Sequence, residues 1–555
     1  MKKSGNSKQF GANAQQTIRM AAAVLVACLG LYLVGNLEGR KGHAQTEAQT
    51  GAQAETTIRE QQGKQIYIQG TSASGKGILA YLGESSLEVP ASAMPCANCH
   101  GLNGAGKPEG GIFPSNVTWE ALTKPYGLTH ADGRRHPPYT ERALELAITR
   151  GTDPAGNKLQ NLMPRYQMSS EDMLGLIAYL KRLGKETDPG IYESKIVIGT
   201  AIPAKGSLGE MGQAIKAVTT AYFDELNSQG GIYNRRIELT FVETGETPAA
   251  TRANFERSFT DRPVFAMTGA FIAGAEKEVV SLLAAKEVPL IGPMTLYPQT
   301  TLPLNRQVFY LLSGTEDQVR ALVDFAAKKS ELKNQGIAVV YPRSQINAVV
   351  VDAIKDQTKK QGWTTPQSYD YVAGQFDAAV LAPKLIAAKP AAVFFLGSVD
   401  EAISLMRAAE KANWFPSVFL TSANAGAGIL QAPVAFDGKV FLSFPTSPED
   451  LTPEGIGEFR ALAEKYKLPT NHVAAQISAY TAAKILTEGL KKMGKDLSRE
   501  KLIQVLEGLY EYRTGLTPAI SFGPNRRVGA SGAYVVTVDL KTKQLSPASG
   551  WIGIN

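Results

Sequence analysis

Residues 195–244, KIVIGTAIPAKGSLGEMGQAIKAVTTAYFDELNSQGGIYNRRIELTFVET, combine two patterns. Each end is a short run rich in β-branched residues, which is typical of a buried strand. The middle carries apolar side chains at helical spacing, Ile215, Val218, Tyr222 and Leu226, and the pair Gly230 and Gly231 follows as a helix stop. Strand, crossover helix and second strand together form the unit from which parallel α/β sheets are built.

The same alternation continues toward the carboxyl terminus. Six further short apolar runs are candidate strands: 264–269, 288–292, 336–341, 391–397, 417–422 and 439–444. At least eight strands spread over this part of the chain predict two similar α/β lobes. At 555 residues the whole chain is long enough for several domains, so a multidomain protein is expected.

Residues 195–555 resemble the periplasmic binding proteins of the branched-chain amino acid type. The matching motifs include KIVIGTAIPAKGSLGEMG, VFAMTGAFIAGA, VPLIGPMT and ISFGPNRRVGASGAYVVTV, in this order. The resemblance implies a two-lobed, type I α/β fold that closes on a small ligand at the strand carboxyl ends. A dinucleotide site is disfavoured, because GSLGEMG lacks the G-x-G-x-x-G spacing and lies too far from the preceding strand.

The resemblance also implies positions for ligand contacts. They are Ser207, Phe271, Ala273, Thr295, Ser398 and Asn424. The family's amino acid binders use hydroxyls in the first lobe and an acid in the second, whereas GAFIAGA offers Phe271, Ile272 and Ala273, and TSANAGAG offers Ala423 and Asn424. The aspartate and tyrosine usual after the fifth strand are also replaced, by Pro342 and Ile346.

These replacements change the class of ligand that we expect, because burying a charged ligand group without a partner is costly. We therefore expect a neutral or apolar small molecule, such as an alcohol, an aldehyde or an aromatic, rather than an α-amino acid. The alternative is that the lobes no longer bind a ligand and serve as a docking platform.

A second motif lies well upstream, in ASAMPCANCHGLNGAG, residues 91–106. Cys96, Cys99 and His100 form the C-x-x-C-H arrangement in which two thiols attach a haem and the imidazole binds its iron. A zinc half-site, a redox dithiol and a structural disulfide are the alternatives, but zinc would need a second Cys or His pair, and a redox dithiol a βαβ context. One covalently bound haem c is the expected cofactor.

Residues 63–186 resemble a class I cytochrome c, through GKQIYIQG, CANCHG and MPRYQMSSEDMLGLIAYLKRL. The resemblance implies an all-α domain with Met163 as the second axial ligand and a helix that starts at SSED. The interval from Gly63 to Cys96 is longer than usual, and its alternating IYIQG and GILAYLG favour a hairpin insertion. Met94 and Met168 are expected to be packing residues. Both His130 and His136 stand in the polar stretch THADGRRHPPYT and are expected at the surface.

The amino-terminal end supplies most of the positive charge. Residues 20–37 contain no charged residue and are just long enough to span a membrane, with Lys and Arg before them. We expect a basic cytoplasmic tail over 1–17, a membrane anchor or signal sequence over 18–38 and a flexible linker over 39–62. Cleavage near residue 44 and lipidation at Cys28 remain alternatives. Each places the later domains on the periplasmic side of a bacterial inner membrane, and no nucleic acid partner is expected.

These expectations define the functional hypotheses. The first is an exported c-type haem protein that carries electrons, joined through a short linker at 187–194 to a binding module at 195–555. The second is an electron-transfer subunit whose large domain docks a periplasmic redox partner such as a quinoprotein dehydrogenase. The third is a receptor for an ABC permease with a haem appendage. Catalysis by the chain itself is not expected, because no nucleophile elbow, metal-binding helix or paired acids stand out.

Overall fold

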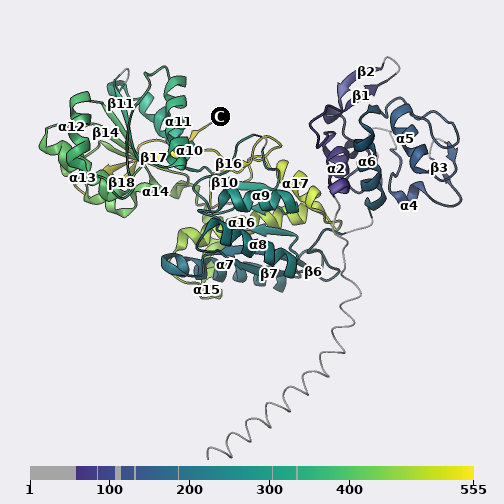
Figure 1. Cartoon of the computed structure of the whole chain (residues 1–555). Helices are drawn as coiled ribbons and strands as arrows, with labels where there is room; N and C mark the ends of the chain where they lie inside the picture. Colours follow the sequence, from purple (N-terminus) through teal and green to yellow (C-terminus); the bar gives the residue numbers. More distant parts are fainter. Residues whose placement is uncertain are drawn as a thin grey trace, which may run out of the picture. The chain divides into compact units, whose positions relative to one another are not determined.

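The computed structural model describes residues 58–83, 86–106, 114–130, 133–184, 187–302, 304–332 and 335–554. The chain divides into two compact units, Met1–Glu186 and Thr187–Asn555 (Figure 1). The expected tail (1–17) and anchor (18–38), and most of the expected linker (39–62), lie outside the described residues. Within the described ranges, no helix is both long enough and apolar enough to cross a membrane.

The first unit is built around two helices that pack together, α2 (Ile58–Gln69) and α6 (Ser170–Arg182). Ser169 caps α6 by accepting a hydrogen bond from the backbone N–H of Asp172, so the helix starts where the SSED pattern predicts. The helices approach closely because Gly63 has no side chain: a Cβ atom there would lie 1.9 Å from the carbonyl oxygen of Gly175. Shorter helices lie between α2 and α6 in the sequence: α3 (Cys96–His100), α4 (Trp119–Leu122) and α5 (Glu141–Arg150).

The expectation of an all-α first unit is wrong in part. Strands β1 (Leu79–Leu82), β2 (Leu87–Pro90) and β5 (Arg165–Gln167) form an antiparallel sheet in the order β2-β1-β5, and β3 (Leu128–Thr129) pairs with β4 (Arg135–His136). The hairpin predicted from GILAYLG is present as β1 and β2. The IYIQ segment is helical instead, because Ile66 and Tyr67 are buried in the apolar core of this unit. Helix α2 therefore begins at Ile58, before the expected boundary at Gly63.

The second unit contains two α/β lobes, as predicted. The sheet of the first lobe has the order β16-β10-β9-β8-β6-β7 and is parallel throughout. Its strands are β6 (Lys195–Ile202), β7 (Arg236–Glu243), β8 (Ala266–Thr268), β9 (Leu290–Ile291), β10 (Val308–Leu312) and β16 (Val528–Ala530). One face is covered by α7 (Gly209–Ser228), α16 (Val473–Met493) and α17 (Arg499–Glu507), the other by α8 (Pro248–Asp261) and α9 (Glu276–Lys286).

The second lobe repeats this layering. Its sheet has the order β12-β11-β13-β14-β15-β17-β18, in which β17 and β18 run antiparallel to their neighbours. The strands are β11 (Ile337–Pro342), β12 (Gln367–Tyr371), β13 (Ala392–Phe395), β14 (Ser417–Thr421), β15 (Val440–Phe444), β17 (Gly532–Asp539) and β18 (Gln544–Pro547), and β19 (Ile552–Gly553) pairs with β17. Helices α10 (Thr315–Ala327) and α11 (Gln345–Lys360) cover one face, α12 (Ala378–Ala388) and α13 (Val399–Lys411) the other.

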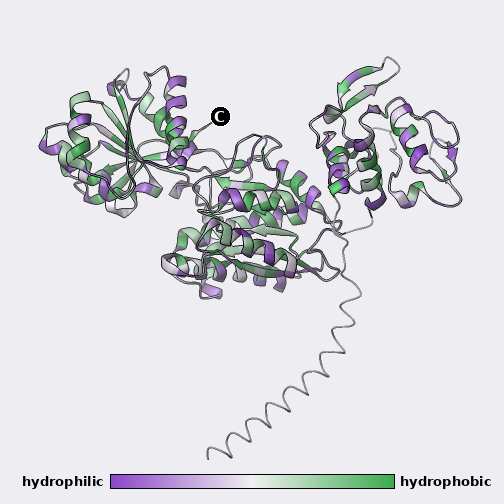
Figure 2. Ribbon diagram, in the orientation of Figure 1, coloured by the Kyte–Doolittle hydropathy of each residue, from purple (hydrophilic) through white to green (hydrophobic). Residues whose placement is uncertain are grey.

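All eight strands predicted from the sequence are present, and all but β7, which lies at a sheet edge, are inner strands of the two sheets, whose apolar residues are green in Figure 2. The chain passes between the lobes three times, after β10, after β15 and after β16. Residues 187–194, expected as a linker, are part of the second unit and are bonded to its first lobe. The carboxylate of Asp188 accepts a hydrogen bond from the backbone N–H of Arg499, and Ile191 forms a β-bridge with Ile196.

Candidate functional site

The C-x-x-C-H residues of the first unit lie on one short helix, α3. Pro95 precedes its first residue, and Gly101, with φ of 75°, ends it. Cys96 and Cys99 stand three residues apart, so their thiols project from the same side of the helix. Cys96 is half-buried and Cys99 is exposed. The hydroxyl of Tyr67 on α2 donates to the carbonyl of Gly101 at 2.7 Å and holds the end of α3 against the core.

The imidazole of His100 is held in one orientation. Its Nδ1 lies 2.8 Å from the carbonyl oxygen of Ser115, and because a carbonyl only accepts, Nδ1 carries the proton. The lone pair is then on Nε2, which makes no hydrogen bond within the described residues. Burial lowers the pKa of His100 and keeps the ring neutral, which is the form that binds a metal.

This arrangement fits a covalently attached haem better than the alternative sites. Burial raises the pKa of the Cys96 thiol to about 12, whereas a redox-active dithiol needs a lowered thiol pKa. Across the described ranges, no cluster of three or more His, Cys, Asp or Glu side chains could hold a metal ion, so no second pair of zinc ligands lies beside Cys96 and Cys99 there. The two cysteines are also not bonded to each other. Two thiols and an oriented imidazole on one turn are the donor set that a c-type haem requires.

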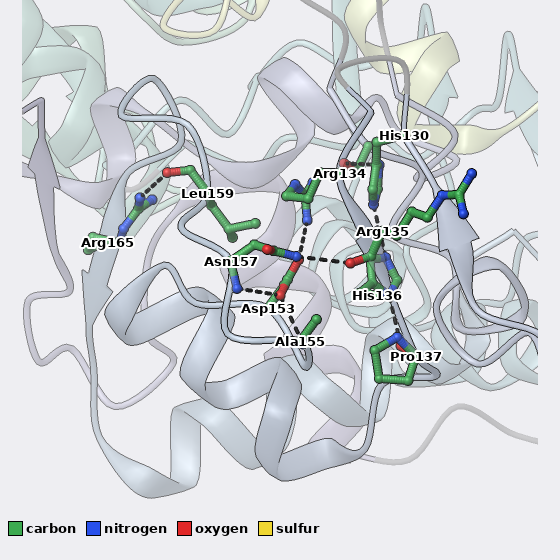
Figure 3. Close-up of polar contacts among 11 residues, drawn as sticks. His130, Arg134, Arg135, His136, Pro137, Asp153, Ala155, Asn157, Leu159 and Arg165 are labelled. Atoms are coloured by element: carbon green, nitrogen blue, oxygen red, sulfur yellow. Dashed lines mark hydrogen bonds and ion pairs between the residues drawn. The ribbon is translucent and has the colours of Figure 1, made fainter.

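Met163, the predicted second axial ligand, is half-buried in a loop that Arg165 organises. The Arg165 guanidinium donates to the carbonyl oxygen of Met163 and, at 3.0 Å, to that of Leu159, as Figure 3 shows for Leu159. The backbone N–H of Met163 donates to the carbonyl of Gln160 at 3.1 Å. The loop is thus fixed from within, although the position of Met163 opposite His100 stays a prediction.

The predicted ligand contacts of the first lobe follow the carboxyl ends of its strands. Phe271 pairs with Met294 in a β-bridge, which brings the loop after β8 beside the loop after β9. The side chain of Ser207 is exposed, as is that of Ala273. The hydroxyl of Thr295 is already used, because it donates to the buried carboxylate of Glu276 at 2.7 Å.

In the second lobe, Ser398 and Asn424 lie close together. Asn424 donates through Nδ2 to the carbonyls of Leu396 and Gly397, at 3.2 and 3.1 Å, and accepts from the hydroxyl of Thr421 at 2.5 Å. It therefore ties the end of β13 to the end of β14.

Ser398 is the N-cap of α13. Its hydroxyl accepts from the backbone N–H of Glu401, whose carboxylate accepts in return from the backbone N–H of Ser398 at 2.8 Å. The same carboxylate oxygen accepts from the hydroxyl of Tyr371, also at 2.8 Å. The polar groups predicted to meet a ligand thus have partners inside the lobe.

The sequence analysis did not identify several residues that shape these sites. The role of Ser115 depends on its backbone, which carries no signal in the sequence. Arg165 stands two residues after Met163, but nothing local shows that its guanidinium turns back onto the loop. The expectation of a surface residue is wrong for His136, which is 5% exposed because β4 directs its side chain inward.

Comparison with protein-family models finds two domains. The model described as periplasmic binding protein matches residues 195–544, more than half of the chain, and the model described as cytochrome c matches residues 91–184. The Leu/Ile/Val-binding protein BraC3 of Rhizobium johnstonii is 23% identical over 338 residues, which cover 59% of this chain and 87% of that protein.

Solved structures support the fold of the second unit. A fatty acid ABC transporter substrate-binding protein from Thermomonospora curvata aligns with a TM-score of 0.53 and 18% identity, covering 67% of this chain and 95% of the other. A branched chain amino acid ABC transporter from Thermus thermophilus with bound valine aligns with a TM-score of 0.54 and 16% identity, covering 66% and 98%. At these identities the likeness shows the fold alone.

Proposed function

Since the chain belongs to the periplasmic binding protein family and also contains a cytochrome c domain, we propose that it is an exported haem protein that carries electrons and binds a small, non-amino-acid ligand. Both domain types favour a periplasmic location. Anchoring to the membrane through residues 18–38 is part of the proposal, and so is one haem attached through Cys96 and Cys99.

The observation that carries the electron-transfer role is the state of His100. Its Nδ1–H is fixed on Ser115 and its Nε2 is left for the iron. The haem, when bound, supplies the one-electron chemistry. Ser115 and burial orient the imidazole of His100 and keep it neutral, and Met163 would be the second ligand of the iron, which would favour electron transfer over binding of substrate to the iron.

The ligand proposal rests on the side chains that follow the carboxyl ends of the strands in the two lobes. A buried carboxylate, Glu276, lies among the first lobe's candidate contacts, where the family's amino acid binders present hydroxyl donors to an α-carboxylate. The amide of Asn424 is used by the protein itself. Neither lobe therefore offers the charge pairing that an α-amino acid needs, and a neutral or apolar molecule fits better. An ABC permease is a possible recipient of that ligand.

Two measurements on the purified full chain test these roles. Haem staining of the denatured protein together with its reduced absorption spectrum should show one covalently bound haem, and a non-covalent or absent haem would refute the electron-carrier role. Thermal unfolding is then followed with alcohols, aldehydes, aromatic compounds and branched-chain amino acids. Stabilisation by one of the first three classes supports the ligand proposal, whereas stabilisation by an amino acid contradicts it.

A competing role, docking of a periplasmic dehydrogenase such as a quinoprotein, is favoured by the internal pairing of Thr295, Ser398 and Asn424. It predicts that no compound raises the unfolding temperature while a reduced dehydrogenase reduces the haem rapidly. Reduction that depends on the ligand would instead couple the two units.

A further inference from the structure

A chain of hydrogen bonds leads from His100 to two other histidines of the first unit. Ser115, whose carbonyl accepts from His100, has its hydroxyl 3.2 Å from Nδ1 of His130. The Nε2 of His130 lies 2.9 Å from the Nε2 of His136, and Nδ1 of His136 lies 2.7 Å from the carbonyl oxygen of Pro137. Figure 3 shows the two imidazoles facing each other.

The partners fix the tautomers of the neutral pair. The carbonyl of Pro137 only accepts, so Nδ1 of His136 carries a proton and its Nε2 is an acceptor. His130 then donates from Nε2, and its Nδ1 accepts from the hydroxyl of Ser115. Each of these hydrogen bonds then has one donor and one acceptor without any added proton.

The contact between the histidines is a hydrogen bond rather than two ligands of a shared ion. The ring centroids are 5.0 Å apart while the facing nitrogens are 2.9 Å apart, so each Nε2 lies close to the line that joins the rings. This is the geometry of a linear N–H···N bond. Two nitrogens that bound one metal ion would point to a third position away from that line. The hydrogen between the rings already belongs to the neutral pair, so the one further proton binds at Nδ1 of His130, and the Ser115 hydroxyl then accepts from it instead of donating.

The surroundings allow that proton to reach the pair. His136 is 5% exposed, but its edge lines a surface hollow of about 530 Å³ that Tyr126, Leu128, Arg135 and Pro137 also line. The hollow brings solvent to the ring of His136, and His130, which holds the nitrogen that can accept a proton, is itself half-exposed to solvent.

The charged and titratable groups near the pair are few among the described residues. Arg134, which follows His130 in the same loop, forms an ion pair with Asp153 at 2.9 Å, so its charge is largely balanced. The ring of Tyr139 packs edge-on against His136, with centroids 4.8 Å apart. Arg135 is exposed beside the hollow.

We propose that His130 and His136 form a proton-binding site coupled to the haem, which takes up one proton when the haem is reduced. The inference rests on the proposed haem attachment at Cys96, Cys99 and His100. When a one-electron donor reduces the bound haem, a hydronium ion in the solvent beside half-exposed His130 would lose a proton and become water, and the one bond formed would be N–H at Nδ1 of His130. Loss of positive charge at the iron strengthens proton binding by the pair, because like charges then repel less.

The test is a reduction potential titration of the full haem-containing chain between about pH 5 and pH 9, a range that brackets ordinary imidazole titration. We expect the potential to fall as the pH rises. If reduction raises the proton affinity of the pair tenfold, the total fall is about 59 mV for a one-electron couple. His130→Gln and His136→Gln should each remove the fall, whereas His472→Gln, which removes a histidine of the second unit, should leave it unchanged.

Two results would overturn the proposal. One is a potential that does not vary with pH in wild-type protein whose spectrum shows bound haem. The other is a fall that survives in both pair variants, which would assign it to the haem's own carboxylates. Absence of haem from the wild-type spectrum refutes the proposed function instead.

A second measurement does not depend on the variants folding. Imidazole NMR of the wild-type protein should show His130 and His136 titrating together, with a midpoint at higher pH in the reduced protein than in the oxidised one. Equal midpoints in the two states would also overturn the proposal.

Discussion

At the end of α3 the Nε2 of His100 is left without a hydrogen bond inside the described chain, whereas at the ends of β13 and β14 the amide of Asn424 bonds to two carbonyls and a hydroxyl. Both residues were predicted to meet a ligand. The difference teaches that residue type alone does not identify a contact. The carbonyl of Ser115 fixes Nδ1 of His100 and leaves Nε2 available to a ligand, whereas the amide of Asn424 is used in hydrogen bonds within the second lobe.

The first prediction removes the attachment chemistry. Cys96→Ser should abolish normal covalent attachment, because a thioether at this position needs the thiol, and stained gels of the denatured protein measure the result. Cys28→Ser is the matched control and should keep the haem. Full covalent haem in the Cys96 variant would contradict the site.

The second prediction concerns the other axial position. Met163→His should lower the reduction potential on the order of 0.1 V, because thioether ligation raises the potential and axial ligands span about 0.8 V in all. Met168→Leu should leave the potential unchanged, since Met168 is half-buried against the apolar core. An unchanged potential in the Met163 variant would exclude this residue as the ligand.

The third prediction addresses the second lobe. Asn424→Ala should destabilise the second unit by about 2 kcal/mol, because two carbonyls and the Thr421 hydroxyl lose their partner. Calorimetric unfolding of the full chain measures this, with the first unit's transition as internal reference. If ligand affinity falls while the unfolding temperature holds, Asn424 is a ligand contact and the contrast with His100 fails.

The smallest effect is expected at the start of α13. Ser398→Ala should cost about 1 kcal/mol of stability through loss of the capping box. Ser207→Ala, at an exposed serine also predicted to contact ligand, should cost close to nothing. Equal stabilities of the two variants would show that the cap contributes little.

The sequence predicts those strands whose residues form a clear apolar run. Of the eight strands found from apolar β-branched runs, all but β7 lie inside the two sheets, and β7 lies at the edge of the first. Strand β12, QSYDY, was not predicted because it lies at a sheet edge and is largely exposed, so it has no apolar run. Strand β10, VFYLL, was also not predicted, although it is an apolar run as long as residues 288–292, which were predicted.

The residues of the candidate sites also differ in how far the sequence predicts them. Cys96, Cys99 and His100 form a contiguous motif whose chemistry follows from its spacing. The partner that orients His100 cannot be predicted from this spacing, because Ser115 acts through its backbone carbonyl. The burial of His136 likewise depends on a strand pairing of only two residues. In the second unit, the hydrogen bonds of Asn424 and Thr295 depend on segments far apart in sequence, which no local pattern contains.

The close approach of α2 and α6 has a consequence for the order in which the first unit can assemble. Gly63 is near the start of the described part of this unit and Gly175 near its end, and each must meet the other's backbone without a side chain between them. During synthesis α2 therefore cannot complete this packing until almost the whole unit has emerged. Because α3 packs against α2, the folded setting of Cys96 and Cys99 is completed only after both cysteines have long emerged from the ribosome.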